Sequence, residues 1–333
     1  MITEILANVA IKKEIMDSIK SGRFKIPEGE SVSETLSIIE KITGDNAESR
    51  AFAAERVTAH IESIVEVTGR PALLVQEGTF EEPILEEWKK PLNRYKSNIE
   101  NAIPSVGRIE LRDHPNYNES HYGTGWLISN DIIVTNRHVA ILFANKSQNG
   151  AWQFRKTVSY GTVKAGIDFL HEHQRFGENE FKIIDILDIV EDVDTGYPDV
   201  AFLRIDTSDS NDIGEPIELA EYIIKNSSKI IAIGYPGNDR AAIRRDGGKK
   251  GEDALDKYFK NIYDVKRVQP GNVLTSDDSL LTYDATTLNK SSGSVVLDIT
   301  TGKAVGLHFE GKYGTSNRAI PSTVLLEKLR ELT

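Results

Sequence analysis

The chain has 333 residues, of which 39% are hydrophobic and 27% charged, a balance typical of a folded protein rather than a disordered one. Its formal net charge of −11 argues against a broad nucleic-acid-binding face. The lack of cysteine excludes disulfides and a thiol nucleophile.

The first residues do not have the pattern of an export signal. Residues 1–20 carry charges throughout and contain no uninterrupted apolar run. No stretch of the chain approaches the roughly 18–20 apolar residues of a membrane span. We therefore expect a cytoplasmic protein without a membrane partner.

Residues 1–102 are predicted to be an α-helical region. Apolar residues recur there at helical spacing, as in the stripe Ile11, Ile15 and Ile19. The longest candidate helix covers residues 46–68, and another covers residues 82–102 with a break at Pro91. This region is expected to regulate the rest of the chain, to bind a regulatory partner or to act as a pro-segment. The alternative is a helical layer that only stabilises the C-terminal two-thirds of the chain.

The texture changes at about Val106, where short apolar runs begin to alternate with turn residues. The runs lie at residues 106–111, 125–129, 132–135, 181–190, 200–205, 229–235, 263–268, 280–284, 294–298 and 304–309. Many short strands with turn signals between them predict a β-sandwich or β-barrel. The segment from Pro321 to Leu332 has the spacing of a C-terminal helix.

Three residues in this β-rich part have the contexts that acyl transfer by a serine requires. His138 follows a strand in TNRHV, Asp199 precedes the apolar run VAFLRI, and Ser292 lies in the turn-like SSGS. A base near neutral pKa, a carboxylate that orients it and an exposed hydroxyl are the parts of a catalytic triad.

Taken singly, each residue has an ordinary alternative: a solvated histidine, an aspartate at a strand start and a serine in a hairpin turn. Together they occur in the order His, Asp, Ser, with gaps of 61 and 93 residues. These gaps suit a base and acid on one barrel and a nucleophile on the next.

The motifs GTGW, TNRHV, PDVAFLR, IAIGYPG, SSGS and GKAVGLHFEG occur in this order between residues 123 and 311. With them, the region from Val106 to Leu332 resembles bacterial trypsin-like serine peptidases, and within these the glutamyl-endopeptidase group. The resemblance implies a mainly β peptidase domain over residues 103–333. It would consist of two six-stranded antiparallel barrels that divide near residues 207–228, and it would hydrolyse protein or peptide substrates.

The resemblance also implies a specificity pocket. His308 in GLHF and Thr287, five residues before Ser292, match the positions that bind an acidic side chain in glutamyl endopeptidases. A preference for Glu or Asp before the cut is therefore expected. The chain departs from the group in one respect: about 100 residues precede the barrels, so a free N-terminal amine does not reach the pocket unless the chain is cut.

A second departure concerns the oxyanion hole, whose donors would be the backbone N–H groups of Lys290 and Ser292. Lys290 stands where the family usually has glycine. A lysine held at positive φ would favour a latent enzyme whose hole is completed only on binding of substrate or a partner. The alternative is a lysine at ordinary negative φ with its amine in solvent.

No cofactor and no metal are expected. His171 and His173 lie two residues apart, but the sequence shows no carboxylate or cysteine clustered with them, so a surface loop is the interpretation adopted. The rival to an active serine endopeptidase is a catalytically inactive binding or scaffold protein on the same fold.

Overall fold

The computed structural model describes residues 70–114, 119, 121–157, 161–190, 198–208, 213–238, 258–311 and 316–332. Pro71–Thr333 form one compact unit. The predicted helices before residue 70 lie outside the described residues, so the prediction for that part of the chain is untested.

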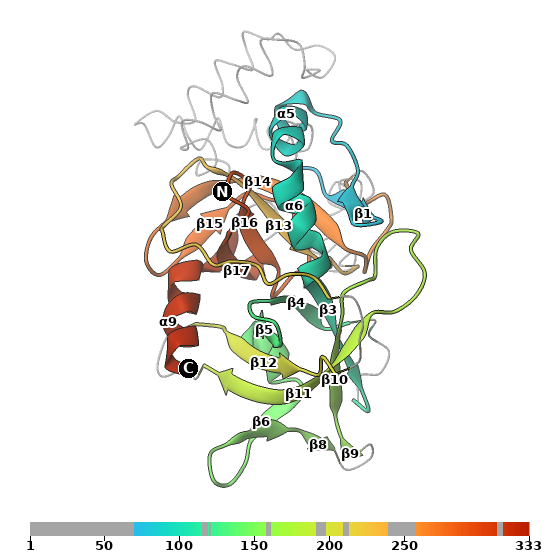
Figure 1. Ribbon diagram of the computed structural model, residues 1–333, viewed down its shortest axis with the longest axis vertical. Helices are drawn as coiled ribbons and strands as arrows, with labels where there is room; N and C mark the ends of the chain where they lie inside the picture. Colours follow the sequence, from blue (N-terminus) through green and yellow to red (C-terminus); the bar gives the residue numbers. More distant parts are fainter. Residues whose placement is uncertain are drawn as a thin grey trace, which may run out of the picture. The chain divides into compact units, whose positions relative to one another are not determined.

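The first half of this unit is a closed six-stranded barrel, seen in green and yellow in Figure 1. Its strands pair antiparallel around the ring in the order β10, β11, β12, β5, β4 and β3. Their bounds are β3 Val106–Arg112, β4 Gly123–Leu127, β5 Ile132–Thr135, β10 Lys164–Asp168, β11 Glu180–Ile189 and β12 Ala201–Ile205. Alternate side chains, among them Ile109, Ile133 and Leu203, fill its interior.

The second half closes in the same way. Its strands are β13 Lys229–Gly234, β14 Arg267–Ser276, β15 Leu281–Tyr283, β16 Val295–Asp298, β17 Ala304–Gly311 and β18 Asn317–Pro321. Their order is β13, β16, β17, β18, β15 and β14, and the antiparallel β13–β14 pairing closes the ring. The expected mainly β fold with two six-stranded antiparallel barrels is therefore confirmed.

Shorter elements decorate the barrels. Two small ribbons pair β6 Ala144–Lys146 with β7 Trp152–Phe154, and β8 Lys156–Thr157 with β9 Gly161–Thr162. The short helix α7 Arg137–Ala140 follows β5, and the predicted C-terminal helix is α9 Ser322–Leu332. Leu325 of α9 is fully buried in the apolar core, so this helix is held by packing.

Residues 71–102 belong to the same compact unit as the barrels. They form β1 Leu73–Gln76, β2 Thr79–Phe80, α5 Glu86–Arg94 and α6 Lys96–Ala102, followed by the turn of 3-10 helix η1 Ile103–Ser105. The strand β1 adds to the edge of the second barrel by pairing with β14 (Figure 1). The predicted helix break lies at Tyr95 and not at Pro91, because α5 continues past the proline until the Tyr95 N–H donates to the Pro91 carbonyl.

Residues 71–102, here called the extension, share the apolar core of the second barrel. Trp88 and Leu92 of α5 and Ile99 of α6 are buried in one cluster with barrel residues such as Ile231 and Leu297. The predicted domain limit at residue 102 therefore falls inside packed structure. The regulatory or partner-binding role of residues 1–102 stays a prediction.

Two buried cations fasten the extension to the barrels. The Lys266 ammonium donates to the carbonyls of Ile103 and Phe169 at 2.8 and 2.7 Å, and the Arg267 guanidinium donates to the Ala72 carbonyl. Burial lowers the pKa of Lys266 to about 8. Because buried charges need partners, loss of residues 71–102 would remove one of the three carbonyls that accept from Arg267, the other two being those of Phe259 and Ile262.

We expect a chain that begins at residue 71 to fold and a chain that begins at residue 103 not to fold. The shorter chain loses β1, Trp88, Leu92 and one of the carbonyls that accept from Arg267, and truncation of one buried tryptophan alone typically costs about 3–5 kcal/mol. Near-ultraviolet circular dichroism and thermal unfolding of both chains test this. A cooperative transition in the chain that begins at residue 103 would contradict it.

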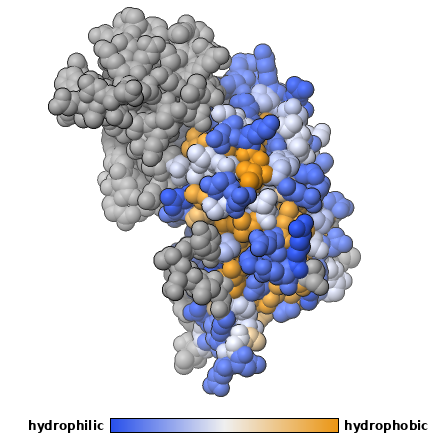
Figure 2. All heavy atoms as spheres, turned by 90° about the vertical axis from the view of Figure 1, so that its left-hand side faces the viewer, coloured by the Kyte–Doolittle hydropathy of each residue, from blue (hydrophilic) through white to orange (hydrophobic). Residues whose placement is uncertain are grey.

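Where the face shown in Figure 2 is coloured by hydropathy, hydrophilic residues cover more of it than apolar ones, which lie in smaller areas between them. Side chains such as Phe176 and Ile84 stand out individually, with exposed fractions of 97% and 92%. Among the described residues, no helix has the length and apolar character needed to cross a membrane.

Candidate active site

His138 and Asp199 meet at the rim of the first barrel. The His138 ring contacts the carboxylate through Nδ1, which lies 2.5 Å from Asp199 Oδ2, and the His138 backbone N–H donates to Asp199 Oδ1 at 2.8 Å. Both carboxylate oxygens are thus engaged by one residue. The His138 side chain is 46% exposed, so its far ring edge faces solvent while Asp199 holds the near edge.

The strand ends fix this pair. β5 ends at Thr135, and the chain turns at Asn136 into α7, which carries His138. The Asn136 amide donates to the Asp199 carbonyl at 2.8 Å, which ties the turn to the start of β12. Since β5 and β12 are neighbours in the barrel, residues 61 positions apart in sequence come together here.

The loop that carries Ser292 comes from the second barrel and docks on the first. The Thr124 N–H of β4 donates to the Ser292 carbonyl at 2.8 Å, and the Thr135 hydroxyl donates to the Thr124 carbonyl at 2.7 Å. Gly293 lies at φ +88°, and a Cβ there would collide with the Thr124 carbonyl oxygen. A glycine is therefore required at position 293 by its positive φ and by the close backbone contact.

These contacts bring Ser292 to the strand end that leads into His138. Ser292 is partly exposed, and within the described part of the chain its hydroxyl makes no hydrogen bond. A catalytic hydrogen bond that is long or absent without substrate is common in such sites.

Two backbone N–H groups of the loop that carries Ser292 have no acceptor among the described residues. Within the described residues, the N–H groups of Lys290 and Ser292 donate to no carbonyl, whereas those of Ser291, Gly293 and Ser294 do. The Gly237 N–H donates to the Asn289 carbonyl at 2.9 Å, which fixes the peptide that precedes Lys290. Because the C=O and N–H of one peptide point in opposite directions, this bond turns the Lys290 N–H away from Gly237.

Lys290 adopts φ +62°, in the left-handed region. Its ammonium lies 2.6 Å from Glu119 Oε2, and the Lys290 side chain lies against the backbone at Gly237. The alternative of negative φ with the amine in solvent is therefore wrong. Glu119 is a residue that the sequence analysis did not select, because 171 positions separate it from Lys290 and no local motif marks it.

His308 lies on β17 directly behind the serine loop. Its backbone accepts from the Gly293 N–H at 2.8 Å and donates to the Ser294 carbonyl at 2.9 Å. The side chain is only 2% exposed, and burial, with a smaller contribution from nearby His138, lowers the pKa of His308 to about 3. His308 is therefore neutral at physiological pH.

A buried tyrosine is the hydrogen-bond partner of His308 Nδ1. The Tyr283 hydroxyl lies 2.7 Å from His308 Nδ1, and burial raises the pKa of Tyr283 well above its usual value. The phenol therefore keeps its proton, and a neutral hydroxyl can donate to Nδ1 or accept from it. When the phenol donates, the single proton of the neutral imidazole is on Nε2 and leaves that nitrogen as a donor.

Thr287 lies at the same end of the second barrel, but its hydroxyl is already used. It donates to Asn317 Oδ1 at 2.6 Å, and Asn317 in turn donates through Nδ2 to the Ala285 carbonyl at 2.5 Å. The expected role of Thr287 in substrate binding stays a prediction. In the structure, Thr287 holds Asn317 in place.

Two closed barrels, with a His–Asp pair at the rim of the first and a serine loop from the second docked on β4 of the first, define a protein of the trypsin-like two-barrel class. A sequence profile described as "Trypsin-like peptidase domain" matches residues 123–307, which is more than half of the chain. The chain therefore belongs to the trypsin-like peptidase domain family. No curated protein matches it.

Two solved structures have similar chains. Rv3671c from M. tuberculosis H37Rv, in an inactive mutant form, is 15% identical, with 73% of this chain and 93% of that chain covered and a TM-score of 0.43. Deg5 is 18% identical, with 74% and 95% covered and a TM-score of 0.45.

Proposed function

We propose that the chain is a serine endopeptidase in which Ser292 is the nucleophile, His138 the general base and Asp199 the residue that orients the base. The observation that carries the proposal is the double engagement of Asp199 by His138, through the ring Nδ1 and the backbone N–H. A solvated surface histidine has no need of such a contact, whereas a base that must present Nε2 to a hydroxyl does.

The chemical steps depend on these positions. With Nδ1–H held by Asp199, Nε2 of His138 takes the Ser292 proton as the oxygen attacks the substrate carbonyl carbon. The imidazolium that forms is stabilised by the Asp199 carboxylate. The same proton passes to the leaving amine, and a water molecule then hydrolyses the acyl-enzyme by the same route. The test is labelling of the purified chain with a fluorophosphonate, which reacts with an activated serine.

The oxyanion that forms during attack needs donors that are not otherwise occupied. The backbone N–H groups of Lys290 and Ser292 meet this requirement among the described residues, since neither donates to a carbonyl. They are the two donors that we assign to the oxyanion hole.

For specificity, we assign His308 to the recognition of an oxygen-bearing side chain, with Glu preferred and Asp next. Its support is the buried, neutral imidazole in contact with Tyr283. With Tyr283 donating to Nδ1, the Nε2–H can donate to a carboxylate oxygen but cannot add a positive charge. Thr287 contributes through Asn317 and not by direct donation.

Replacing His308 by alanine is expected to reduce kcat/KM for cleavage after Glu by about 10-fold or more, and cleavage after an apolar residue by less, since one hydrogen bond to a charged group is worth roughly 1.5–3 kcal/mol. Peptides that differ only at the residue before the cut measure this. Thr287→Val, which replaces threonine by a residue of the same shape, is the control, and its kcat/KM for cleavage after Glu should fall by less. Equal losses for both peptides in His308→Ala would contradict the assignment.

The pH dependence separates this pocket from one built on an imidazolium. Because the pKa of His308 is depressed to about 3, the donor stays neutral as pH rises from 5 to 8. The ratio of kcat/KM for cleavage after Glu to kcat/KM for cleavage after Gln should therefore stay constant between pH 5 and pH 8, including near pH 6.5, where an ordinary histidine titrates. A ratio that falls steeply there would indicate a protonated histidine.

Latency is the regulatory part of the proposal. A lysine at positive φ costs roughly 1–2 kcal/mol relative to glycine. This strain favours rotation of the peptide before Lys290, which would move the Lys290 N–H out of the oxyanion hole. The ion pair with Glu119 and the bond from Gly237 to Asn289 oppose this rotation. Binding of a substrate, or of a partner at residues 1–102, would act on this balance.

The second candidate function is an inactive binding protein on the same fold. The observations that favour it are the strained Lys290 and the Ser292 hydroxyl that is not hydrogen-bonded to His138. Folded wild-type chain that is not labelled by fluorophosphonate, with or without peptide, would support this candidate against the peptidase.

A further inference from the structure

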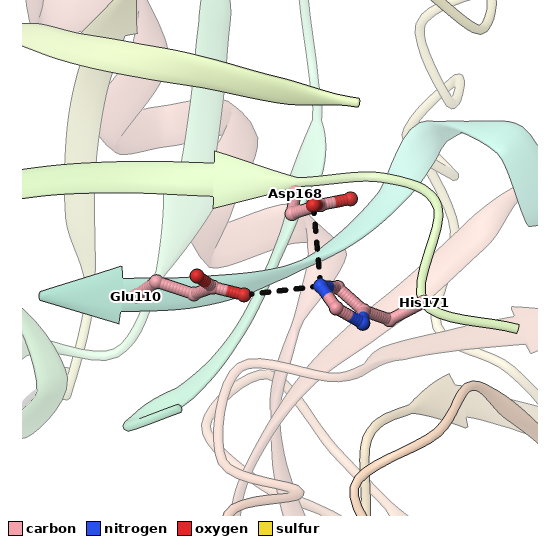
Figure 3. A group of neighbouring side chains, drawn as sticks. All are labelled: Glu110, Asp168 and His171. Atoms are coloured by element: carbon pink, nitrogen blue, oxygen red, sulfur yellow. Dashed lines mark ion pairs between the residues drawn. The ribbon is translucent and has the colours of Figure 1, made fainter. Parts of the chain in front are cut away.

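Three side chains of metal-binding type converge outside the active site. Glu110 comes from β3, Asp168 from the end of β10 and His171 from the loop after β10. His171 Nε2 lies 3.3 Å from Glu110 Oε1 and 3.2 Å from Asp168 Oδ2, as the dashed lines in Figure 3 show. The expectation that no carboxylate accompanies His171 is thus corrected by the fold.

Strand pairing explains the convergence. β3 and β10 are antiparallel neighbours in which Glu110 pairs with Gly166 and Asp168 with Arg108. The residues between them, Ile109 and Ile167, point into the barrel core. Because side chains alternate along a strand, Glu110 and Asp168 both lie on the outer face of the same strand pair. Neither the spacing nor the composition of either strand shows this.

Among the described residues, Asp168 Oδ2 has an ion-pair contact with His171 Nε2 but no hydrogen bond. The side chain is 1% exposed, and its Oδ1 accepts from the N–H groups of Leu170 and Asn179 at 2.7 and 3.2 Å. Oδ2 is directed at His171 Nε2. A buried carboxylate oxygen in this position requires a positive partner.

His171 alone cannot form a good hydrogen bond to both carboxylates at once. A ring N–H points along one direction, whereas Nε2 lies almost equally far from two oxygens, and both distances exceed the 2.7–2.9 Å of a charge-assisted hydrogen bond. Ligands about 2.0–2.1 Å from a tetrahedral zinc ion lie roughly 3.3 Å apart. The two measured separations match that value.

We propose that Glu110, Asp168 and His171 bind a zinc ion through one carboxylate oxygen each and His171 Nε2, with water as the fourth ligand. One nitrogen and two oxygens suit zinc, whereas calcium requires six to eight oxygen ligands and magnesium an octahedral oxygen set. The hydrogen bonds from Leu170 and Asn179 to Asp168 Oδ1 orient that carboxylate. Arg108 Nε donates at 2.6 Å to Glu110 Oε1, the oxygen that faces His171, so Oε1 would bind the ion through its remaining lone pair.

The position gives this ion a structural role. The loop after β10 is tied to the second barrel and its extension, since the His171 carbonyl accepts from the Lys266 N–H at 2.9 Å and the His173 N–H donates to the Val75 carbonyl at 2.8 Å. A metal held between β3 and this loop would clamp the two barrels together. It is separate from the His138–Asp199 pair, so the proposal does not depend on peptidase activity.

The experiment titrates metal-free full-length chain with Zn²⁺ by calorimetry and measures metal content after gel filtration. We expect one zinc per chain and a rise in Tm of about 5 °C or more at 100 times Kd. Chelation should lower Tm while leaving the rate of peptide hydrolysis at low temperature unchanged.

Two variants and a control locate the site. His171→Ala and Glu110→Gln are expected to weaken zinc binding by 100-fold or more, whereas His173→Ala, in the same loop, should bind as the wild type does. Cobalt substituted for zinc reports the geometry by its visible absorption, which both ligand variants should lose. The absence of stoichiometric zinc in the wild type, or equal binding by all three variants, would overturn the proposal.

Discussion

Ser292→Ala is expected to abolish peptide hydrolysis and fluorophosphonate labelling, with a loss in kcat of about 10⁴–10⁶. The physical reason is that the change removes the attacking oxygen and nothing else. Within the described residues the hydroxyl makes no hydrogen bond that the fold needs, so the variant should keep the wild-type Tm.

The neighbouring serine provides the matched control. Ser291 is buried, and its hydroxyl accepts only a long contact of 3.4 Å from the Leu288 N–H. Ser291→Ala should therefore keep labelling and activity. His138→Ala should lose activity as Ser292→Ala does, because no base then takes the proton. Cleavage by Ser292→Ala at the wild-type rate would refute the assignment of the nucleophile.

The barrels could be predicted from the sequence because strand alternation and turn residues are local signals. The strands that these signals miss show their limit. β14 is anticipated only at its start, because Pro270 and Gly271 interrupt the apolar pattern, yet both residues pair with β13. β10 and β18 are not anticipated, since KAGID and NRAIP are short and contain glycine or proline.

The candidate site divides in the same way. His138, Asp199 and Ser292 each carry a local motif, so sequence order is enough to select them. Their neighbours carry none: Glu119, which pairs with Lys290, is defined only by the folded loop. The use of the Thr287 hydroxyl by Asn317, 30 residues away, likewise depends on how β18 lies beside β15.

The proposed zinc ligands make this point most clearly. His171 is visible in the sequence as one of two closely spaced histidines, but Glu110 is 61 positions earlier and reaches it only through the β3–β10 register. The same holds for residues 71–102, whose helical spacing is recognisable while their burial against the second barrel is not. The spacing of apolar residues identifies the buried face of a helix, but the residues that pack against that face are known only from the folded structure.

Lys290→Gly is the other decisive change, because loss of one oxyanion donor is worth about 10²–10³ in rate. Glycine adopts the observed φ of +62° without the roughly 1–2 kcal/mol that lysine costs there. If the hole of the resting enzyme is assembled only part of the time, the variant should raise basal kcat/KM by about 5- to 30-fold. It should also gain less from any activating partner.

Two further substitutions separate backbone strain from the ion pair. Lys290→Ala keeps the strain and loses the contact with Glu119, so its basal kcat/KM should fall below the wild-type value. Glu119→Gln keeps the lysine but removes the charge 2.6 Å from its ammonium, and should fall by a few-fold, since a partly exposed pair contributes about 1 kcal/mol or less. Rising ionic strength should lower the basal kcat/KM of the wild type, because salt screens the Lys290–Glu119 pair, and should leave that of Lys290→Gly unchanged. Equal basal activity in Lys290→Gly and the wild type would show that the hole is already complete, and would remove latency from the proposed function.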